Sequence, residues 1–285
     1  MSVLPYLYRI AAGAILGIVQ GISEWLPISS KTQILLAASF LLHISFAQGY
    51  ALGLFLEIGT FIAAVIYFRG ELLKAILALL GKGGADGTQL LKYLTVTTLI
   101  TAAIAVPLYL LVSDLVKGPI TGAPMIVLGA LLLADYLVIT ASRSRPRLRR
   151  DIKSMGLVDF ALVGVAQGIS ALPGVSRSGA TVSAMLFMGV KPAEAFRLSF
   201  IAGVIAALGA TGVTLIFSHG SVGYVVGKLS IYGIIAAIAV SAAISIFLIG
   251  ALIRFAGTSK IRTLLLALAL IAIASGIVAM LTGVG

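Results

Sequence analysis

The chain has 285 residues, of which 60% are hydrophobic and only 10% are charged, and its mean hydropathy is +1.17. Soluble domains carry about 25% charged residues, so these values exclude a soluble fold and indicate a membrane protein built from apolar helices. The absence of cysteine excludes disulfides and thiol catalysis, and the net charge of +11 does not indicate nucleic-acid binding because no segment resembles a base-reading motif.

Apolar runs long enough to cross a bilayer follow one another along the chain. The first apolar region covers about 6–42 and is interrupted by "GISEWLPISS", residues 21–30. A second region, about 156–190, is interrupted in the same way by Pro, Gly and Ser. Between and after these two regions lie six unbroken runs, which we predict to be full transmembrane helices: about 50–68, 90–112, 121–141, 194–217, 231–253 and 263–283.

The basic residues predict the orientation of these spans. Four stretches hold 15 of the 20 Lys and Arg residues: Arg69–Lys92, Arg143–Lys153, Lys191–Arg197 and Arg254–Arg262. The positive-inside rule places all four in the cytoplasm, and the six spans then alternate in direction. Each interrupted region must therefore enter and leave the membrane on one side, the first from outside and the second from the cytoplasm. We predict two re-entrant helical hairpins, with both termini outside.

The two interrupted regions share a motif. "GIVQGIS" (17–23) recurs as "GVAQGIS" (164–170), and each copy is followed by Leu-Pro and then by serines. Three spans separate the copies, so the second is inverted relative to the first, an arrangement that builds binding sites in transporters. The predicted fold is an all-α polytopic membrane protein with an inverted-topology internal repeat. Its single membrane domain, 1–285, consists of repeat one (about 1–141), a basic cytoplasmic linker (about 142–155) and repeat two (about 156–285).

The second motif continues as "LPGVSRSGAT", residues 172–181, and contains an arginine at membrane depth. Arg177 is costly there unless it is paired, and its planar charged fork suits phosphate oxygens. The hydroxyls of Ser176, Ser178 and Thr181 add donors, and a helix that starts after Ser178 adds free N–H groups. This pattern favours an oxyanion pocket. The alternative is an arginine that snorkels to the interface or pairs with a buried carboxylate.

Glu24 is the corresponding polar residue of the first motif. Its carboxylate needs a cation in apolar surroundings, either Arg177 or a divalent metal, and it is a candidate metal ligand, general base or structural partner of Arg177. Ser29 and Ser30 follow a proline. A serine at such a place donates a hydrogen bond to phosphate, acts as a nucleophile beside a base, or caps the helix. Glu57 is a further carboxylate inside a predicted span, and we expect it to line the same cavity.

At these motifs the chain resembles the undecaprenyl-pyrophosphate phosphatase family of the bacitracin-resistance type. The strongest segment is "DFALVGVAQGISALPGVSRSGATVSAMLFMG" (159–189), followed by "GIVQGISEWLPISS", "EIGTFIAAVIYFRGEL" and "AEAFRLSF". The resemblance implies a multi-pass enzyme of the cell membrane that hydrolyses a polyprenyl (undecaprenyl-type) diphosphate to the monophosphate and phosphate. Such enzymes recycle the lipid carrier for cell-envelope glycan synthesis, and their active site faces the outer side.

The resemblance also implies roles for individual residues. The glutamate-rich motif of the family falls on Gln20 and Glu24, which are thereby predicted to bind a divalent cation, Mg²⁺ or Ca²⁺. The predicted catalytic residues are Glu24, Ser30 and Arg177. The predicted phosphate-binding residues are Ser29, Lys31, Ser176, Ser178, Thr181 and Gln33. The expected partners are the diphosphate lipid, the bilayer and a second copy of the chain in a homodimer, with no nucleic acid.

Two positions depart from the family pattern. The family continues Ser-Ser-x-Gly-His, whereas this chain has Lys31, Thr32 and Gln33. Gln33 does not titrate near neutral pH and cannot replace a histidine base. Gly203 stands where the family tends to have a proline. Three functions stay open. The first is a phosphatase whose base is Glu24, with Ser30 or a water as nucleophile, and the second is a polyprenyl-phosphate flippase or transporter without hydrolysis. The third is an ion-coupled transporter of another anion, which does not account for the resemblance.

Overall fold

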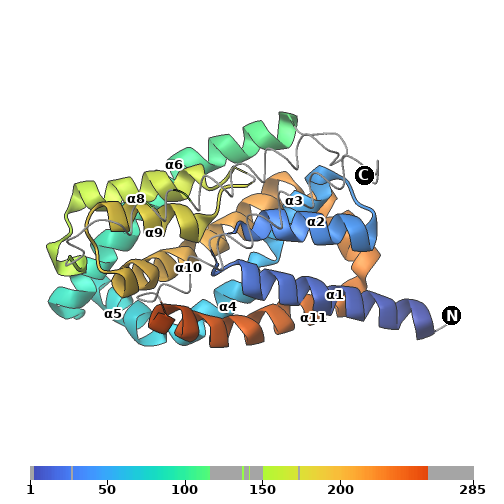
Figure 1. The fold of residues 1–285 in the computed structure, drawn as a ribbon, viewed down its shortest axis with the longest axis horizontal. Coiled ribbons are helices and arrows are strands. Elements are labelled where there is room, and N and C mark those ends of the chain that lie inside the picture. Colours follow the sequence, from blue (N-terminus) through green and yellow to red (C-terminus); the bar gives the residue numbers. More distant parts are fainter. Residues whose placement is uncertain are drawn as a thin grey trace.

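The computed structural model describes residues 3–26, 28–115, 137, 141, 150–172 and 174–255. Within them the regular elements are helices, apart from one isolated bridge between Arg150 and Val190. Most helices lie along one common direction (Figure 1). The elements are α1 (Val3–Ser23), α2 (Ser30–Leu42), α3 (Phe46–Phe55), α4 (Glu57–Tyr67), α5 (Arg69–Leu79), α6 (Gly84–Leu115), η1 (Ile152–Ser154), α8 (Leu157–Ile169), α9 (Arg177–Phe187), α10 (Pro192–Phe217) and α11 (His219–Phe255).

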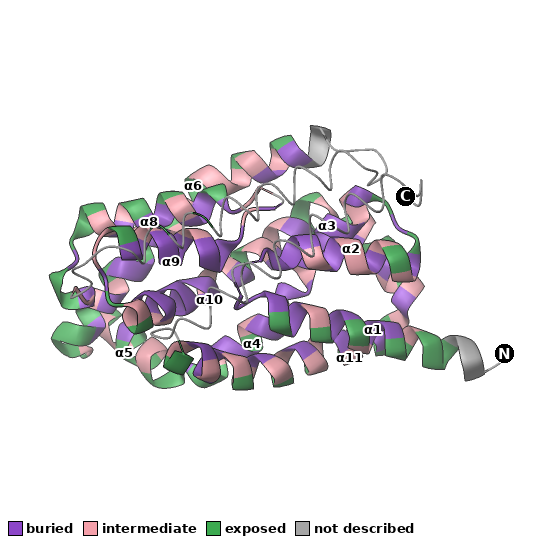
Figure 2. Ribbon diagram, in the orientation of Figure 1, coloured by how far each residue is buried: buried purple, intermediate pink, exposed green. Residues whose placement is uncertain are grey.

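Several of these helices fit a multi-pass membrane protein. Five segments in the described part of the chain are long and apolar enough to cross a bilayer: Tyr6–Ser23, Phe46–Tyr67, Gly84–Val112, Pro192–Phe217 and His219–Phe255. Their outward faces carry exposed large apolar side chains, such as Leu99 and Phe247, while the buried residues gather inside (Figure 2). Such an apolar outer surface suits lipid rather than water.

The predicted spans agree with these helices where they can be compared. The runs at about 50–68, 90–112, 194–217 and 231–253 fall on α3–α4, α6, α10 and α11. Two helical stretches are interrupted, at Leu56 between α3 and α4 and at Ser230 within α11, where φ is 63°. The predicted spans 121–141 and 263–283 lie outside the continuously described residues.

Two pairs of antiparallel helices approach each other from opposite ends of the molecule. Figure 1 shows α1 running from the right-hand end to the centre, where α2 returns, and α8 running from the left-hand end to the centre, where α9 returns. Their connections meet: the amide of Gly174 donates to Thr32 Oγ1 at 3.1 Å, and Ser178 Oγ donates to the Leu26 carbonyl at 3.1 Å. This meeting brings polar residues about half a chain apart into contact.

Glycines of the repeated motif let two helix pairs pack backbone to backbone. A Cβ atom on Gly17 of α1 would lie 2.5 Å from the Ala237 carbonyl oxygen of α11, and one on Gly164 of α8 would lie 2.9 Å from the Thr97 carbonyl oxygen of α6. Small residues at such crossings are the usual device by which membrane helices approach closely. The first helix of each motif copy therefore packs against a long helix from the other half of the chain.

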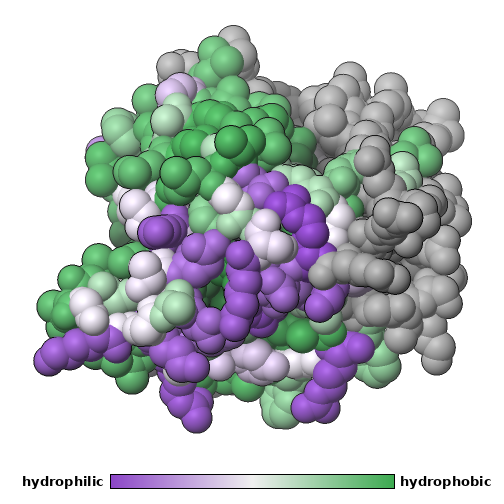
Figure 3. All heavy atoms as spheres, turned by 90° about the vertical axis from the view of Figure 1, so that its left-hand side faces the viewer, coloured by the Kyte–Doolittle hydropathy of each residue, from purple (hydrophilic) through white to green (hydrophobic). Residues whose placement is uncertain are grey.

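The left-hand end of the molecule in Figure 1 is polar. Figure 3 shows hydrophilic side chains gathered on this end, with apolar side chains around them. Arg197 pairs there with Glu71 and Glu194, and Arg150 Nη2 lies 2.6 Å from Asp159 Oδ2. Partial burial tends to raise the pKa of the Asp159 carboxyl, but hydrogen bonds from Arg150 and a backbone amide hold it below its usual range. This end carries the described parts of the basic stretches.

Candidate active site

Glu24 is the centre of a buried hydrogen-bonded group. It follows the C-terminal end of α1, and only 4% of its surface is exposed. Its Oε1 accepts a hydrogen bond from Arg177 Nη2 at 2.5 Å, and its Oε2 accepts bonds from Ser30 Oγ at 2.5 Å and Gln20 Nε2 at 2.9 Å. A carboxylate bonded to a serine hydroxyl has the geometry of a base beside a nucleophile.

The local backbone aims Ser30 and Arg177 at the same point. Ser29 adopts a left-handed conformation with φ of 56° and precedes Ser30, the first residue of α2. Such backbone strain costs about 1–3 kcal/mol and is characteristic of functional sites. On the other side, the Ser176 hydroxyl caps α9 by accepting a bond from the Gly179 amide, and Arg177 is the first residue of that helix. The N-termini of α2 and α9 thus both lie at Glu24, where their dipoles favour an anion.

Arg177 depends on a glycine of α10. Its Nη2 bonds to Glu24, whereas its Nε and Nη1 atoms are buried without a hydrogen-bond partner within the described residues. A Cβ atom built on Gly203 would lie 1.4 Å from Arg177 Nη1. The guanidinium therefore occupies the space that any side chain at position 203 would need. Arg177 can lie where it is observed only because position 203 is glycine and not the proline of the family pattern.

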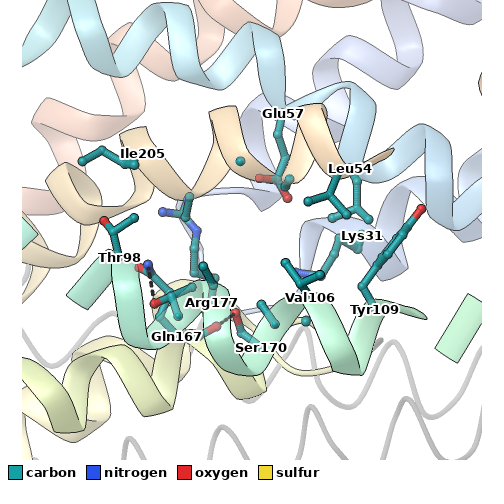
Figure 4. Close-up of a pocket in the computed structure, with 18 of the residues that line it drawn as sticks. Lys31, Leu54, Glu57, Thr98, Val106, Tyr109, Gln167, Ser170, Arg177 and Ile205 are labelled. Carbon is teal, nitrogen blue, oxygen red and sulfur yellow. Dashed lines mark hydrogen bonds between the residues drawn. The ribbon is translucent and has the colours of Figure 1, made fainter. Parts of the chain in front are cut away.

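A cavity of about 160 Å³ lies beside this group (Figure 4). Lys31 of α2, Glu57 of α4 and Arg177 of α9 reach it with charged side chains. Lys31 is 5% exposed, and its ammonium group makes no hydrogen bond or ion pair with a described residue. Much of the remaining wall consists of small or apolar residues from α6 and α10, including Thr98, Ala102, Ala105, Val106, Ile205, Ala206, Gly209, Ala210 and Val213. The cavity thus has a charged part and an apolar part.

The other hydroxyls predicted to bind phosphate are engaged with the protein. Ser178 Oγ donates to the Leu26 carbonyl and lies 3.2 Å from Ser176 Oγ. Thr181 Oγ1 lies 2.6 Å from a serine hydroxyl of α10, and Ser29 Oγ lies 3.0 Å from a threonine hydroxyl of α2. These contacts hold the motif loops against each other and against α10. Phosphate binding by Ser29, Ser176, Ser178 and Thr181 stays a prediction.

Gln33 lies apart from the Glu24 group. Its Nε2 donates to the Ile28 carbonyl oxygen at 3.2 Å, and the side chain is partly buried. Gln33 therefore bonds the turn that precedes α2, and no hydrogen bond joins it to Glu24, Ser30 or Arg177. Its predicted contact with phosphate stays a prediction.

The structure adds residues that the motifs did not select. Glu57 lines the same cavity as Arg177, which confirms the expectation raised by a lone carboxylate in an apolar run. Gln167, Tyr50 and Tyr109 also line it. Gln167 Nε2 donates to a threonine of α6, while its Oε1 has no partner in the described part of the chain. Aromatic residues in apolar runs give no sequence signal of a cavity.

The predicted metal ligands lie together but are already hydrogen-bonded. Gln20 and Glu24 bond to each other, both Glu24 oxygens have partners, and Gln20 Oε1 has none among the described residues. In the described ranges no group of three or more His, Cys, Asp and Glu side chains is placed to hold a metal ion. Any cation at this site would need oxygen ligands from elsewhere, such as the substrate or water.

Comparison with known proteins identifies the family. Residues 13–278 match the family described as "Bacitracin resistance protein BacA". The chain belongs to this family. An undecaprenyl-diphosphatase from Saccharolobus solfataricus is similar to this BacA-family chain, with 50% identity over 271 residues, which are 94% of this chain and 96% of that protein.

Two further relatives of this BacA-family chain carry the same name. The protein from Saccharolobus islandicus (strain M.14.25 / Kamchatka #1) is 52% identical over 225 residues, 78% of this chain and 79% of the relative. The protein from Pyrobaculum aerophilum is 48% identical over 214 residues, 75% and 79% of the two chains. The resemblance drawn from the two motifs is confirmed.

Proposed function

We propose that this chain is an integral membrane phosphatase that hydrolyses an undecaprenyl-type polyprenyl diphosphate to the monophosphate and phosphate. The observation that carries the proposal is the hydrogen-bonded group of Ser30, Glu24 and Arg177. It lies beside a cavity whose wall has charged side chains in one part and apolar side chains in the other. The shared name of the relatives supports the same substrate. The reaction recycles the lipid carrier for cell-envelope glycan synthesis.

The geometry supports a two-step reaction. Ser30 Oγ loses its proton to Glu24 Oε2 and bonds to the terminal phosphorus, and the bond from that phosphorus to the bridging oxygen breaks. Polyprenyl monophosphate leaves with the bridging oxygen. The oxygen of a water molecule then bonds to the phosphorus of the phosphoserine and the Ser30 Oγ–P bond breaks. Glu24 returns its proton to Ser30 Oγ, and inorganic phosphate leaves with the oxygen and the protons of the water. The Nε and Nη1 donors of Arg177, which have no partner among the described residues, and the ammonium of Lys31 stabilise the charge on the transferred phosphoryl group.

A divalent cation, Mg²⁺ or Ca²⁺, is part of the proposal. When bound, such an ion offsets negative charge on the diphosphate oxygens. Gln20 Oε1 has no partner among the described residues, which supports the sequence-based assignment of Gln20 and Glu24 as ligands. Both Glu24 oxygens already accept hydrogen bonds, which speaks against it.

We further infer an inverted repeat with two re-entrant hairpins, α1–α2 and α8–α9, in a cell-membrane protein whose site faces outward. The reciprocal packing of α1 on α11 and of α8 on α6 supports the repeat. A second cavity, of about 330 Å³, supports an outward opening because it shares Tyr50 and Tyr109 with the first and lies where α10 meets α11. Its walls include the polar residues Ser218 and His219.

The orientation is testable by single-cysteine labelling, since the chain has no native cysteine. Lys82 in the α5–α6 connection and Gly220 in α11 are both exposed. We expect Gly220→Cys to react with a membrane-impermeant maleimide in intact cells and Lys82→Cys to react only after permeabilisation. Labelling of Lys82→Cys from outside would reverse the proposed orientation.

Phosphate release by the purified protein tests the function. We expect release from C15 and C55 prenyl diphosphates in the presence of Mg²⁺ or Ca²⁺, and loss of release in Ser30→Ala, because that variant lacks the hydroxyl bonded to Glu24. A wild-type protein that releases no phosphate with any divalent metal, yet moves a polyprenyl phosphate across proteoliposomes, would instead be a flippase.

A further inference from the structure

Glu57 is a buried carboxylate that the proposed reaction does not use. It is the first residue of α4, directly after the interruption at Leu56, and only 4% of its surface is exposed. Its side chain has no hydrogen bond or ion pair with a described residue. Figure 4 shows the carboxylate pointing into the cavity, from the wall opposite Gln167 and Ser170. Burial disfavours the ionised form of such a carboxyl group unless a cation lies beside it.

The charges around the cavity indicate the sign of that partner. Arg177 and Glu24 form an ion pair, and the positive charge of Lys31 is matched by the negative charge of Glu57. When Glu57 is ionised, these four groups of the described residues sum to zero at a site that must accept a diphosphate with several negative charges. A bare carboxylate on the cavity wall would repel this substrate. A cation between the carboxylate and the diphosphate removes the repulsion.

We propose that Glu57 is the protein ligand of a divalent cation that also binds oxygen atoms of the diphosphate in the cavity. The proposal rests on the proposed function. Magnesium ions are commonly held by one or two carboxylates together with substrate phosphates and water. Gln167 Oε1, a second cavity oxygen without a partner among the described residues, offers an acceptor for a cation-bound water.

This site differs from the one predicted from the sequence. There the cation would bind Gln20 and Glu24, and Glu24 would have to give up hydrogen bonds to Arg177 or Ser30. At Glu57 the cation displaces no hydrogen bond made by a described residue. Glu24 then keeps its contact with the serine hydroxyl and remains the base.

The test measures cation binding without turnover. Mn²⁺ is titrated into the purified full-length chain and followed by electron paramagnetic resonance. The titration is run with and without farnesyl methylenediphosphonate, whose carbon bridge resists hydrolysis. We expect tight Mn²⁺ binding by the wild type only with this analogue, because the protein alone supplies few ligands. Glu57→Gln should weaken that binding at least about tenfold, since it removes the charge and keeps the shape.

Two control variants make the result specific. Asp86→Asn removes an exposed carboxylate that pairs with Lys153 at the polar end, and it should bind Mn²⁺ like the wild type. Gln20→Ala tests the sequence-based site and should also retain binding. Thermal unfolding checks that each variant is folded. The proposal is wrong if Glu57→Gln binds Mn²⁺ like the wild type, if Gln20→Ala alone loses binding, or if the wild type shows no analogue-dependent binding.

Failure of the proposed function gives a different pattern. In that case the wild type releases no phosphate from the hydrolysable farnesyl diphosphate, while Mn²⁺ still binds with the analogue and depends on Glu57. The cation site would then stand without the phosphatase.

Discussion

Glu24→Gln is expected to lower phosphate release by about 10²–10⁴-fold, the usual contribution of a general base. The amide keeps the shape of the side chain but cannot accept a proton from Ser30 Oγ, which lies 2.5 Å from Glu24 Oε2. Gln33→Ala, at the position of the family histidine, should lower release by less than about tenfold, because it removes one neutral hydrogen bond to a backbone carbonyl.

The measurement is the initial rate of phosphate release from farnesyl diphosphate, with thermal unfolding as the control for folding. The pH–rate profile of the wild type should also lack a limb near a pKa of about 6.5, because no histidine lines the cavity beside Arg177. The assignment of the base is wrong if Gln33→Ala eliminates turnover while Glu24→Gln retains it.

Gly203→Ala is expected to leave the fold intact and to lower phosphate release by roughly 10- to 150-fold, the worth of one charge-assisted hydrogen bond of about 1.5–3 kcal/mol. The added Cβ would lie 1.4 Å from Arg177 Nη1, so the flexible end of the arginine must move away from its position beside Glu24. The loss is therefore expected in catalysis rather than in stability.

Gly212→Ala is the matched control. Gly212 lies on the same helix, and a Cβ atom there would meet nothing within 4 Å. Phosphate release and thermal unfolding should both match the wild type in this variant. Wild-type kcat and KM in Gly203→Ala would show that the observed position of Arg177 does not matter for turnover.

The membrane class and the main polar residues followed from the sequence itself. A long apolar run can only be a membrane helix or a deeply buried one, and a charged residue within it is costly unless it is functional or paired. For that reason Glu24, Arg177 and Glu57 could be selected from residue type and surroundings alone. The repeated "GxxQGIS" motif also paired the two loops that meet at the centre, because its polar residues recur with the same spacing.

Contacts between distant helices decided the rest. The packing of α2, α4, α9 and α10 determines three features of the site. Gln33 hydrogen-bonds to the turn before its own helix, Gly203 leaves space for Arg177, and Glu57 faces the same cavity as Lys31. Local patterns encode the period of a helix and the cost of a charge, but not the distance between side chains far apart in the chain. Close packing of the folded helices sets those distances, so only the tertiary structure shows which polar atoms are paired and which remain free.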